Sequence, residues 1–244
     1  MKTTKVLKTN ISETNINEVS NILNSSSNQL VAICNANTLV RSVRNSYIKE
    51  IINSFTIKTP DGFPVAKALS IISKQKFLRV DGYNVFLKTI EDGLSKNRSH
   101  YFFGSSEYIT KLMINNLEKL YPKIQIRGYI CPEIMEPDLL VEKYKDEIKN
   151  IDADIVWVSL GFPKQEIFID KIIKATKINS NFVGIGGVFE WVAGTKKKAP
   201  EWAANMGFEW FLRLIQDPKR LYKRYLIDNT LFVFYFLRQV FFGR

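Results

Sequence analysis

Short apolar runs alternate with longer amphipathic segments along most of the chain. The runs are rich in Val, Ile and Phe, as buried strands are, and they cover 29–35, 55–60, 100–104, 124–130, 154–160 and 181–187. Apolar residues at helical spacing cover 38–54, 83–97, 105–122, 138–151 and 164–176. Strands and helices that alternate through short loops predict an α/β fold with a mostly parallel, Rossmann-like sheet flanked by helices.

The ends of the predicted strands carry the residues of most chemical interest. In sheets of this kind, ligands bind at the carboxyl ends of the strands. Five polar or glycine residues lie at or just after such ends: Asn35, Asp61, Gly104, Gly161 and Gly186. We therefore expect a ligand cleft along this edge of the sheet.

Asp61 belongs to the stretch "TPDGFPVAKA", in which Pro60 and Pro64 bracket an Asp-Gly pair. Asp-Gly is a common turn, and one interpretation is a turn with a solvated carboxylate. The position after a strand favours a second interpretation, in which the stiffened turn holds Asp61 as a general base.

Two further segments combine a strand end with a helix start. "LGFPKQE" (160–166) would offer free N–H groups to a diphosphate and Gln165 to a sugar hydroxyl, or it is a plain strand-to-helix turn. "GIGGVFEWVAG" (184–194) lacks the dinucleotide register GxGxxG. Its glycines allow either close approach of a ligand or tight strand–helix packing.

The sequence predicts no metal site. Asp152 and Asp154 resemble the carboxylate pair of metal-dependent sugar-nucleotide transferases, but they precede a strand, so we expect a solvated turn there. His100 is the only histidine, and we treat it as structural. Cys34 and Cys131 lack metal-type spacing and predict buried thiols rather than a disulfide.

The formal charge of the chain is +11, which favours an anionic partner such as a nucleic acid, an acidic membrane or a phosphorylated substrate. Much of this charge lies in the aromatic segment 196–244, with ten Lys and Arg against four acids. This composition is typical of a helix in a membrane interface, or of a helix docked on the core or another subunit. We therefore divide the chain into an α/β catalytic domain (1–195) and a helical, membrane-associating appendage (196–244).

The longest apolar run, 230–237, is too short to span a bilayer, and no apolar run follows the lysines of the first 15 residues. We expect a cytoplasmic protein that is peripheral on the inner face of the cell membrane.

In the basic stretch 213–224, a cluster of Arg213, Arg220, Lys223 and Arg224 would hold a diphosphate or lipid phosphates, unless it is only a solvated basic face.

Five motifs occur in order along nearly the whole chain: "TPDGFPV", "LRVDGYNVF", "LGFPKQE", "GIGGVFEWVAGTKKKAPEW" and "GFEWFLRLIQDPKRLYKRY". In these the chain resembles the WecG/TagA/CpsF family of bacterial glycosyltransferases. The resemblance implies an inverting transferase that moves N-acetylmannosamine, its uronate or a related hexose from a UDP-sugar to an undecaprenyl-diphosphate-linked sugar. It also implies catalysis without a metal or other cofactor, and an appendage that binds the membrane and completes the active site.

The resemblance assigns roles to individual residues. Asp61 is the implied base, and the implied substrate-binding residues are Asn35, Arg79, Gln165, Gly186, Gly187, Glu190, Arg213 and Arg220, with Lys223 or Arg224 as a third cation. Three positions depart from the family pattern. Ile33 replaces a frequent Thr, Asn84 replaces the usual Asp, and Lys223 stands where Arg is common.

Two alternatives remain at this stage. The charge and the aromatic residues are compatible with a nucleic-acid-binding protein, although no recognisable binding module is present. A non-catalytic UDP-sugar-binding protein would carry the same motifs. Homo-oligomerisation is left open, and we expect no nucleic-acid partner.

Overall fold

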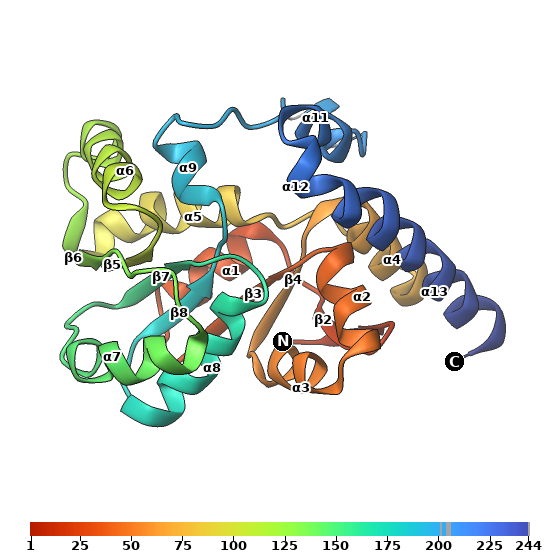
Figure 1. Cartoon of the computed structure of the whole chain (residues 1–244), viewed down its shortest axis with the longest axis horizontal. Helices are drawn as coiled ribbons and strands as arrows, with labels where there is room; N and C mark the ends of the chain where they lie inside the picture. Colours follow the sequence, from red (N-terminus) through yellow and green to blue (C-terminus); the bar gives the residue numbers. More distant parts are fainter. Residues whose placement is uncertain (201, 204–205, 244) are drawn as a thin grey trace.

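The computed structural model describes residues 1–200, 202–203 and 206–243, without the side chains of residues 216, 220 and 224. Among these residues, six parallel strands form one sheet in the order β4-β3-β8-β7-β5-β6 (Figure 1). The strands are β3 (Leu30–Cys34), β4 (Ile57–Pro60), β5 (Ser99–Gly104), β6 (Gln125–Ile130), β7 (Ile155–Ser159) and β8 (Asn181–Gly184). The predicted α/β class is confirmed.

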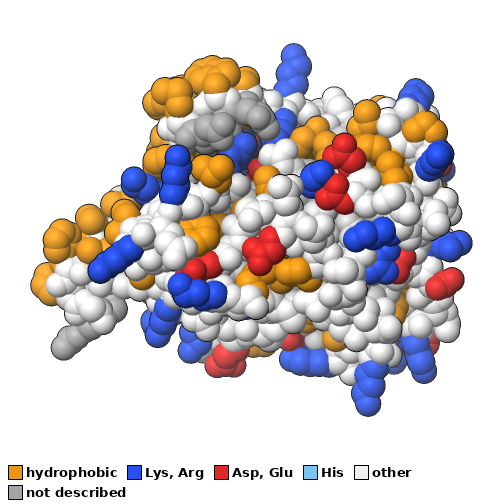
Figure 2. Space-filling model, turned by 180° about the vertical axis from the view of Figure 1, so that it is seen from behind, with side chains coloured by type: hydrophobic (Ala, Val, Ile, Leu, Met, Phe, Trp, Pro, Cys, Tyr) orange, Lys and Arg blue, Asp and Glu red, His pale blue; other side chains and the backbone are white. Residues whose placement is uncertain are grey.

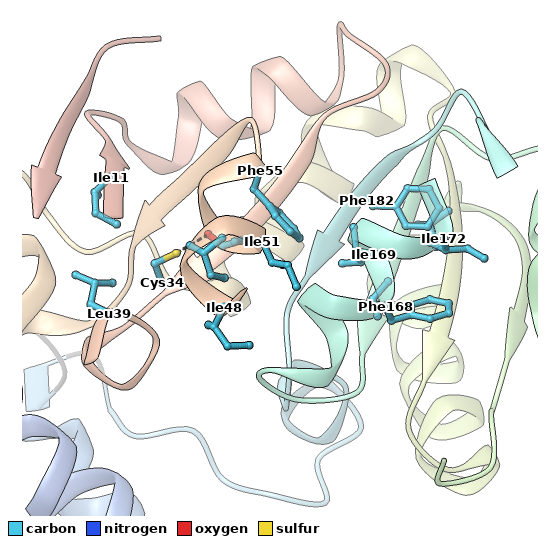
Figure 3. Close-up of a cluster of buried hydrophobic side chains, with 14 of the residues drawn as sticks. Ile11, Cys34, Leu39, Ile48, Ile51, Phe55, Phe168, Ile169, Ile172 and Phe182 are labelled. Atoms are coloured by element: carbon cyan, nitrogen blue, oxygen red, sulfur yellow. Dashed lines mark hydrogen bonds between the residues drawn. The ribbon is translucent and has the colours of Figure 1, made fainter. Parts of the chain in front are cut away.

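Helices cover both faces of the sheet because its strands are apolar on both sides. In β7, Val156 and Val158 face one cluster of buried side chains, and Ile155 and Trp157 face the other. Figure 3 shows the first cluster, where Phe168 and Phe182 pack beside the sheet. Its helices are α2 (Ala36–Arg44), α3 (Ser46–Ser54), α4 (Gly62–Ser73), α7 (Pro137–Lys149) and α8 (Lys164–Thr176). The second cluster contains α1 (Ile16–Leu23), α5 (Gly82–Gly93) with the short turn η1 (Leu94–Lys96), α6 (Glu107–Leu120) and α9 (Val188–Val192).

Two local predictions were wrong or incomplete. The single helix expected over 38–54 is two helices, because Asn45 ends α2 and its Oδ1 accepts a hydrogen bond of 3.1 Å from Ile48 N at the start of α3. An antiparallel hairpin of β1 (Thr3–Val6) and β2 (Thr9–Ser12) was not predicted. It lies beside β4, where Lys58 N donates to Ser12 Oγ over 3.1 Å.

The residues that we set aside as structural have structural partners. His100 is 1% exposed, and its Nδ1 accepts a hydrogen bond of 3.1 Å from Trp157 Nε1. Asp154 accepts hydrogen bonds of 2.8 Å from both Ser99 N and Ser99 Oγ and pairs with Arg98, so the expectation of a solvated turn is wrong for Asp154. Cys34 is buried as expected, but Cys131 is only partly buried, and both are free thiols.

The C-terminal segment is helical and docks on the core. It contains α11 (Glu209–Gln216), α12 (Pro218–Tyr222), the π-helical turn η2 (Lys223–Asp228) and α13 (Asn229–Phe242), and α13 runs along α2 and α4 (Figure 1). Phe232 is buried in this contact, and Gln239 bonds the hairpin through Leu7 N (2.7 Å) and Lys5 O (2.9 Å).

The opposite side of α13 is exposed and apolar. It carries Val233, Phe234, Leu237, Val240, Phe241 and Phe242, each at least 46% exposed. Figure 2 shows hydrophobic side chains gathered over the C-terminal helices, with Lys and Arg side chains beside them. No helix in the described part of the chain is both long and apolar enough to cross a bilayer.

Candidate active site

A cavity of about 390 Å³ opens at the carboxyl ends of β3, β4, β7 and β8. The strand-end residues Asn35, Asp61, Gly161 and Gly186 all line it, whereas Gly104 does not. Residues of α11 and α12, including Arg213 and Leu221, complete the wall. The cavity therefore lies where the sequence placed a ligand cleft, between the sheet and the C-terminal helices.

Asp61 lies between this cavity and a second one. Its backbone N–H donates to Cys34 O over 2.9 Å, which ties the turn after β4 to the end of β3. The smaller cavity, of about 70 Å³, is lined by the aromatic side chains of Phe63, Trp210 and Tyr225. Four residues line both cavities: Asn35, Asp61, Glu209 and Arg213. A carboxylate is thus placed on a wall shared by a large polar cavity and a small aromatic one.

Asn35 has a structural role in addition to its place in the lining. Its Oδ1 accepts a hydrogen bond of 3.3 Å from Thr38 N and caps α2. The cap fixes the start of α2 beside the cavity, because it satisfies one of the free N–H groups of the first turn.

Gln165 holds two loops of the larger cavity together. The residue is 4% exposed, and its Oε1 accepts hydrogen bonds from Gly161 N (3.2 Å) and Gly186 N (3.0 Å). Its Nε2 donates to Glu166 Oε1 over 2.8 Å. A Cβ added to Gly184 would lie 2.9 Å from Gln165 Nε2, so the glycine leaves room for this amide. Gln165 is therefore part of the floor of the cavity and organises its backbone.

The glycine segment after β8 includes Gly186, whose backbone conformation favours glycine. Gly186 has a φ of +57°, and its carbonyl accepts a hydrogen bond of 2.6 Å from Ser159 Oγ at the end of β7. Gly187 and Glu190 also line the cavity. Glu190 is paired with Lys196, whose Nζ lies 2.7 Å from Oε1 and 2.8 Å from Oε2.

A chain of alternating charges joins the core to α11. Arg79 Nη1 lies 3.4 Å from Asp81 Oδ2 and 3.1 Å from Glu209 Oε2, and Arg213 Nη1 lies 3.5 Å from Glu209 Oε1. At the other end, Lys198 Nζ lies 3.9 Å from Asp81 Oδ1. Arg79 itself does not line the larger cavity, so its contact with this site passes through Asp81 and Glu209.

The predicted basic cluster is only partly described. Arg213 faces the cavity, and its guanidinium lies 4.9 Å from the ring centre of Trp191. Lys223 is exposed, with Nζ 5.9 Å from the ring centre of Tyr222, and does not line the cavity. The side chains of Arg220 and Arg224 lie outside the described residues. The role assigned to this cluster stays a prediction.

The described lining of the larger cavity is acidic. Its cations are Lys196 and Arg213, and its carboxylates are those of Asp61, Asp81, Glu166, Glu190, Glu209 and Asp217. Sequence reasoning missed Asp81, Glu166, Glu209 and Asp217, although Asp81 precedes a glycine at a helix start as Asp61 does. Within the described part of the chain, no group of three His, Cys, Asp or Glu side chains could hold a metal ion.

Comparison with known families identifies the family of the chain. The profile of the glycosyl transferase WecG/TagA/CpsF family matches residues 4–244. The chain belongs to the WecG/TagA/CpsF family. It is therefore a glycosyltransferase, an enzyme rather than a non-catalytic protein, and the resemblance noted in the motifs is confirmed.

Three curated relatives of this WecG/TagA/CpsF protein carry the same name. The N-acetylglucosaminyldiphosphoundecaprenol N-acetyl-beta-D-mannosaminyltransferase of Bacillus subtilis (strain 168) is 27% identical over 201 residues, which cover 81% of this chain and 75% of the relative. Its namesake in Bacillus spizizenii is 27% identical over 73% of this chain and 68% of the relative. The Staphylococcus aureus (strain MW2) protein of that name is 27% identical over 81% of this chain and 76% of the relative.

Proposed function

We propose that this glycosyltransferase moves N-acetylmannosamine, its uronate or a related hexose from a UDP-sugar to a sugar on undecaprenyl diphosphate. The product would serve the synthesis of a cell-surface polysaccharide of the teichoic acid type. One observation carries the proposal: the Asp61 carboxylate borders both cavities, so a donor in the larger one and an acceptor sugar in the smaller one would meet there. The names of the relatives supply the acceptor class.

We place the donor in the larger cavity. The segments held by Gln165 bring backbone groups of Gly161 and Gly186 to its floor, where glycine permits close approach of a ligand. Lys196 and Arg213 are its described cations, and they are the groups that would contact the diphosphate. We expect the donor to bind through these residues with no metal ion.

In the proposed reaction, Asp61 is the general base. A hydroxyl of the acceptor sugar gives its proton to the Asp61 carboxylate as its oxygen attacks the anomeric carbon of the donor. The new carbon–oxygen bond forms on the face opposite the leaving group, and the old bond to the diphosphate breaks with its electron pair going to UDP. Attack from the smaller cavity would therefore invert the configuration of the sugar.

The exposed side of α13 supports a peripheral site on the inner face of the membrane, where such an acceptor is held. Its aromatic side chains, flanked by Lys and Arg, have the composition of interfacial helices. Because the opposite side of α13 packs on α2 and α4, the helix would carry the catalytic core to the lipid surface.

The test is a direct assay of binding and transfer. Purified full-length protein in nonionic detergent without added metal should be stabilised by UDP and by one UDP-sugar, and not by GDP-mannose or NAD, because a ligand that binds only the native state raises Tm. The same UDP-sugar should be consumed, with release of UDP, when N-acetylglucosaminyl-diphosphate-polyprenol is added. Failure of every uridine nucleotide to bind would contradict the proposal.

A further inference from the structure

A groove of about 660 Å³ runs along α4 next to the smaller cavity. One wall is a single face of α4, formed by Phe63, Ala66, Lys67, Ser70 and Ile71, and it continues to Lys74 just after the helix. These positions follow the three- and four-residue spacing of neighbours on a helix surface. The other wall is the segment 75–79, which Ser70 Oγ holds against α4 by accepting a hydrogen bond of 2.9 Å from Phe77 N.

The groove and the smaller cavity meet at Phe63, which lines both. Phe63 lies two residues after Asp61, and the far end of the segment 75–79 is tied to the same strand end by a hydrogen bond of 2.9 Å from Val80 N to Pro60 O. Along α4, the groove extends about 16 Å from Phe63 to Lys74 at 1.5 Å per residue. It therefore begins beside the cavity that Asp61 lines and extends along α4 toward exposed residues.

The groove has an apolar lining and a basic rim. Ile71 is 47% exposed and Leu78 is 72% exposed, so both offer apolar surface to a ligand in the groove. Lys67, Lys74 and Lys76 are exposed beside them, and none of the three forms an ion pair with any residue that the structure describes. An apolar channel with unpaired cations at its edge is complementary to a lipid that carries phosphate.

We infer that this groove binds the diphosphate and the first prenyl units of the lipid-linked acceptor. The acceptor sugar occupies the small aromatic cavity, the diphosphate contacts Lys67, Lys74 and Lys76, and the prenyl chain leaves over Ile71 and Leu78. The inference rests on the proposed function, and it adds a binding site that lies outside the larger cavity. It also separates the two substrates, with the nucleotide on one side of Asp61 and the lipid on the other.

The experiment compares two acceptors with the same N-acetylglucosaminyl-diphosphate head, one on a long polyprenyl chain and one on a short water-soluble alkyl chain. Both are assayed in nonionic detergent without anionic lipid. The variant K67Q/K74Q/K76Q should raise KM for both acceptors about tenfold, because both carry the diphosphate. The variant I71N/L78N should raise KM for the long-chain acceptor only. Neither should change KM for the UDP-sugar.

Matched controls remove the same groups from other surfaces. K119Q/K123Q/K149Q removes three exposed lysines, and I134N/L139N removes two exposed apolar side chains in α7 and the loop before it. Both controls should keep the wild-type KM, and equal Tm values would show that all variants fold.

The outcomes separate this inference from the proposed function. Absence of transfer by the wild-type protein would contradict the proposed function. Wild-type transfer together with an unchanged acceptor KM in both groove variants would overturn the inference that the groove binds the acceptor. It would not contradict the proposed function. A lysine variant with normal KM in detergent but weaker binding to phosphatidylglycerol vesicles would show that the lysines bind lipid headgroups instead, which also overturns the inference.

Discussion

Arg79 and Glu209 are 130 residues apart in the chain, and their side chains meet at 3.1 Å between Nη1 and Oε2. The contact joins the segment before α5 to the first turn of α11. The side chain of Arg79 is 8% exposed and that of Glu209 is 20% exposed, so water screens the pair only weakly. Because Glu209 also contacts Arg213, the pair helps to fix the guanidinium that faces the cavity.

Breaking this pair should loosen α11 and weaken donor binding. In a double-mutant cycle of R79Q and E209Q, we expect a coupling free energy of about 1–3 kcal/mol, measured by urea unfolding. Hydrogen exchange should increase in α11 and α12, and KM for the UDP-sugar should rise. The exposed pair of Lys145 and Glu142 serves as the control, with an expected coupling of about 0.5 kcal/mol or less. Equal coupling free energies for the two pairs would show that the Arg79–Glu209 pair stabilises the protein no more than an exposed ion pair does.

Replacing Asp61 by Asn should remove the general base without changing the fold. We expect D61N to lose about 100-fold or more of the single-turnover transfer rate. UDP should still raise its Tm, since Asp61 is not among the groups assigned to the diphosphate. The control is D152N, which changes an exposed carboxylate before β7, at the opposite end of the strands. A D61N protein with the wild-type rate would eliminate Asp61 as the base.

Substituting Gln165 by Leu should destabilise the floor of the cavity. The change leaves Gly161 N and Gly186 N without the oxygen that both now use, and each unsatisfied buried group costs about 1–3 kcal/mol. We expect the free energy of unfolding to fall by about 2–4 kcal/mol, with weaker UDP binding. Q125L, at an exposed position of β6, should change the stability by less than about 0.5 kcal/mol. An unaltered stability of Q165L would show that the loops do not depend on this amide.

His100 should make the fold sensitive to acid. Burial lowers the pKa of His100 from its ordinary 6.5 to about 4, so the folded protein keeps the imidazole neutral while the unfolded chain takes up a proton below pH 6.5. The unfolded state binds more protons in this window, and stability is therefore lost as the pH falls from 6.5 to 4, by roughly 3 kcal/mol.

The comparison variant for this effect is H100N, whose side-chain oxygen can replace Nδ1 as the acceptor for Trp157 Nε1. Urea unfolding at pH 7 and pH 4.5 should show a larger loss of stability for the wild type than for H100N. Identical losses would mean that His100 is not the group responsible.

The exposed side of α13 should govern attachment to lipid. The variant F234S/F241S/F242S removes three rings that are 59%, 73% and 73% exposed. We expect at least about tenfold weaker binding to vesicles that contain phosphatidylglycerol, because each ring adds apolar area to an interface. The control L120S/I134S/L139S changes exposed apolar residues elsewhere and should bind as the wild type does. Sedimentation with vesicles measures both, and equal binding would exclude α13 as the anchor.

The sheet could be predicted from the sequence because its signals are local. Each strand of the sheet appeared in the sequence as a short apolar run. The turn after β4 correctly placed Asp61 at the carboxyl ends of the strands. The β1–β2 hairpin was missed because strands such as "TTKV" and "TNIS" are short and polar, and their order comes from pairing with each other and contact with β4. Asn45 was likewise overlooked, since a single capping side chain divides an otherwise continuous helical pattern.

The acidic part of the site could not be predicted, because it depends on pairs that are distant in the chain. Nothing near Glu209 indicates that its partner is Arg79, and nothing near Asp81 indicates Lys198. Gln165 was predicted to contact substrate, but its hydrogen bonds to the backbone were not predicted. Its Oε1 accepts from Gly161 N and Gly186 N, and these two groups come together only because β7 and β8 are neighbouring strands.

The docking of α13 also constrains how the chain folds during synthesis. The segments that receive this helix, namely the hairpin, α2 and α4, have all been synthesised by Ser73. At about 5–20 residues per second, the ribosome needs on the order of ten to thirty seconds more to deliver α13. During that time the receiving surface is an open apolar site in a partly made protein, which is where a chaperone would be expected to bind.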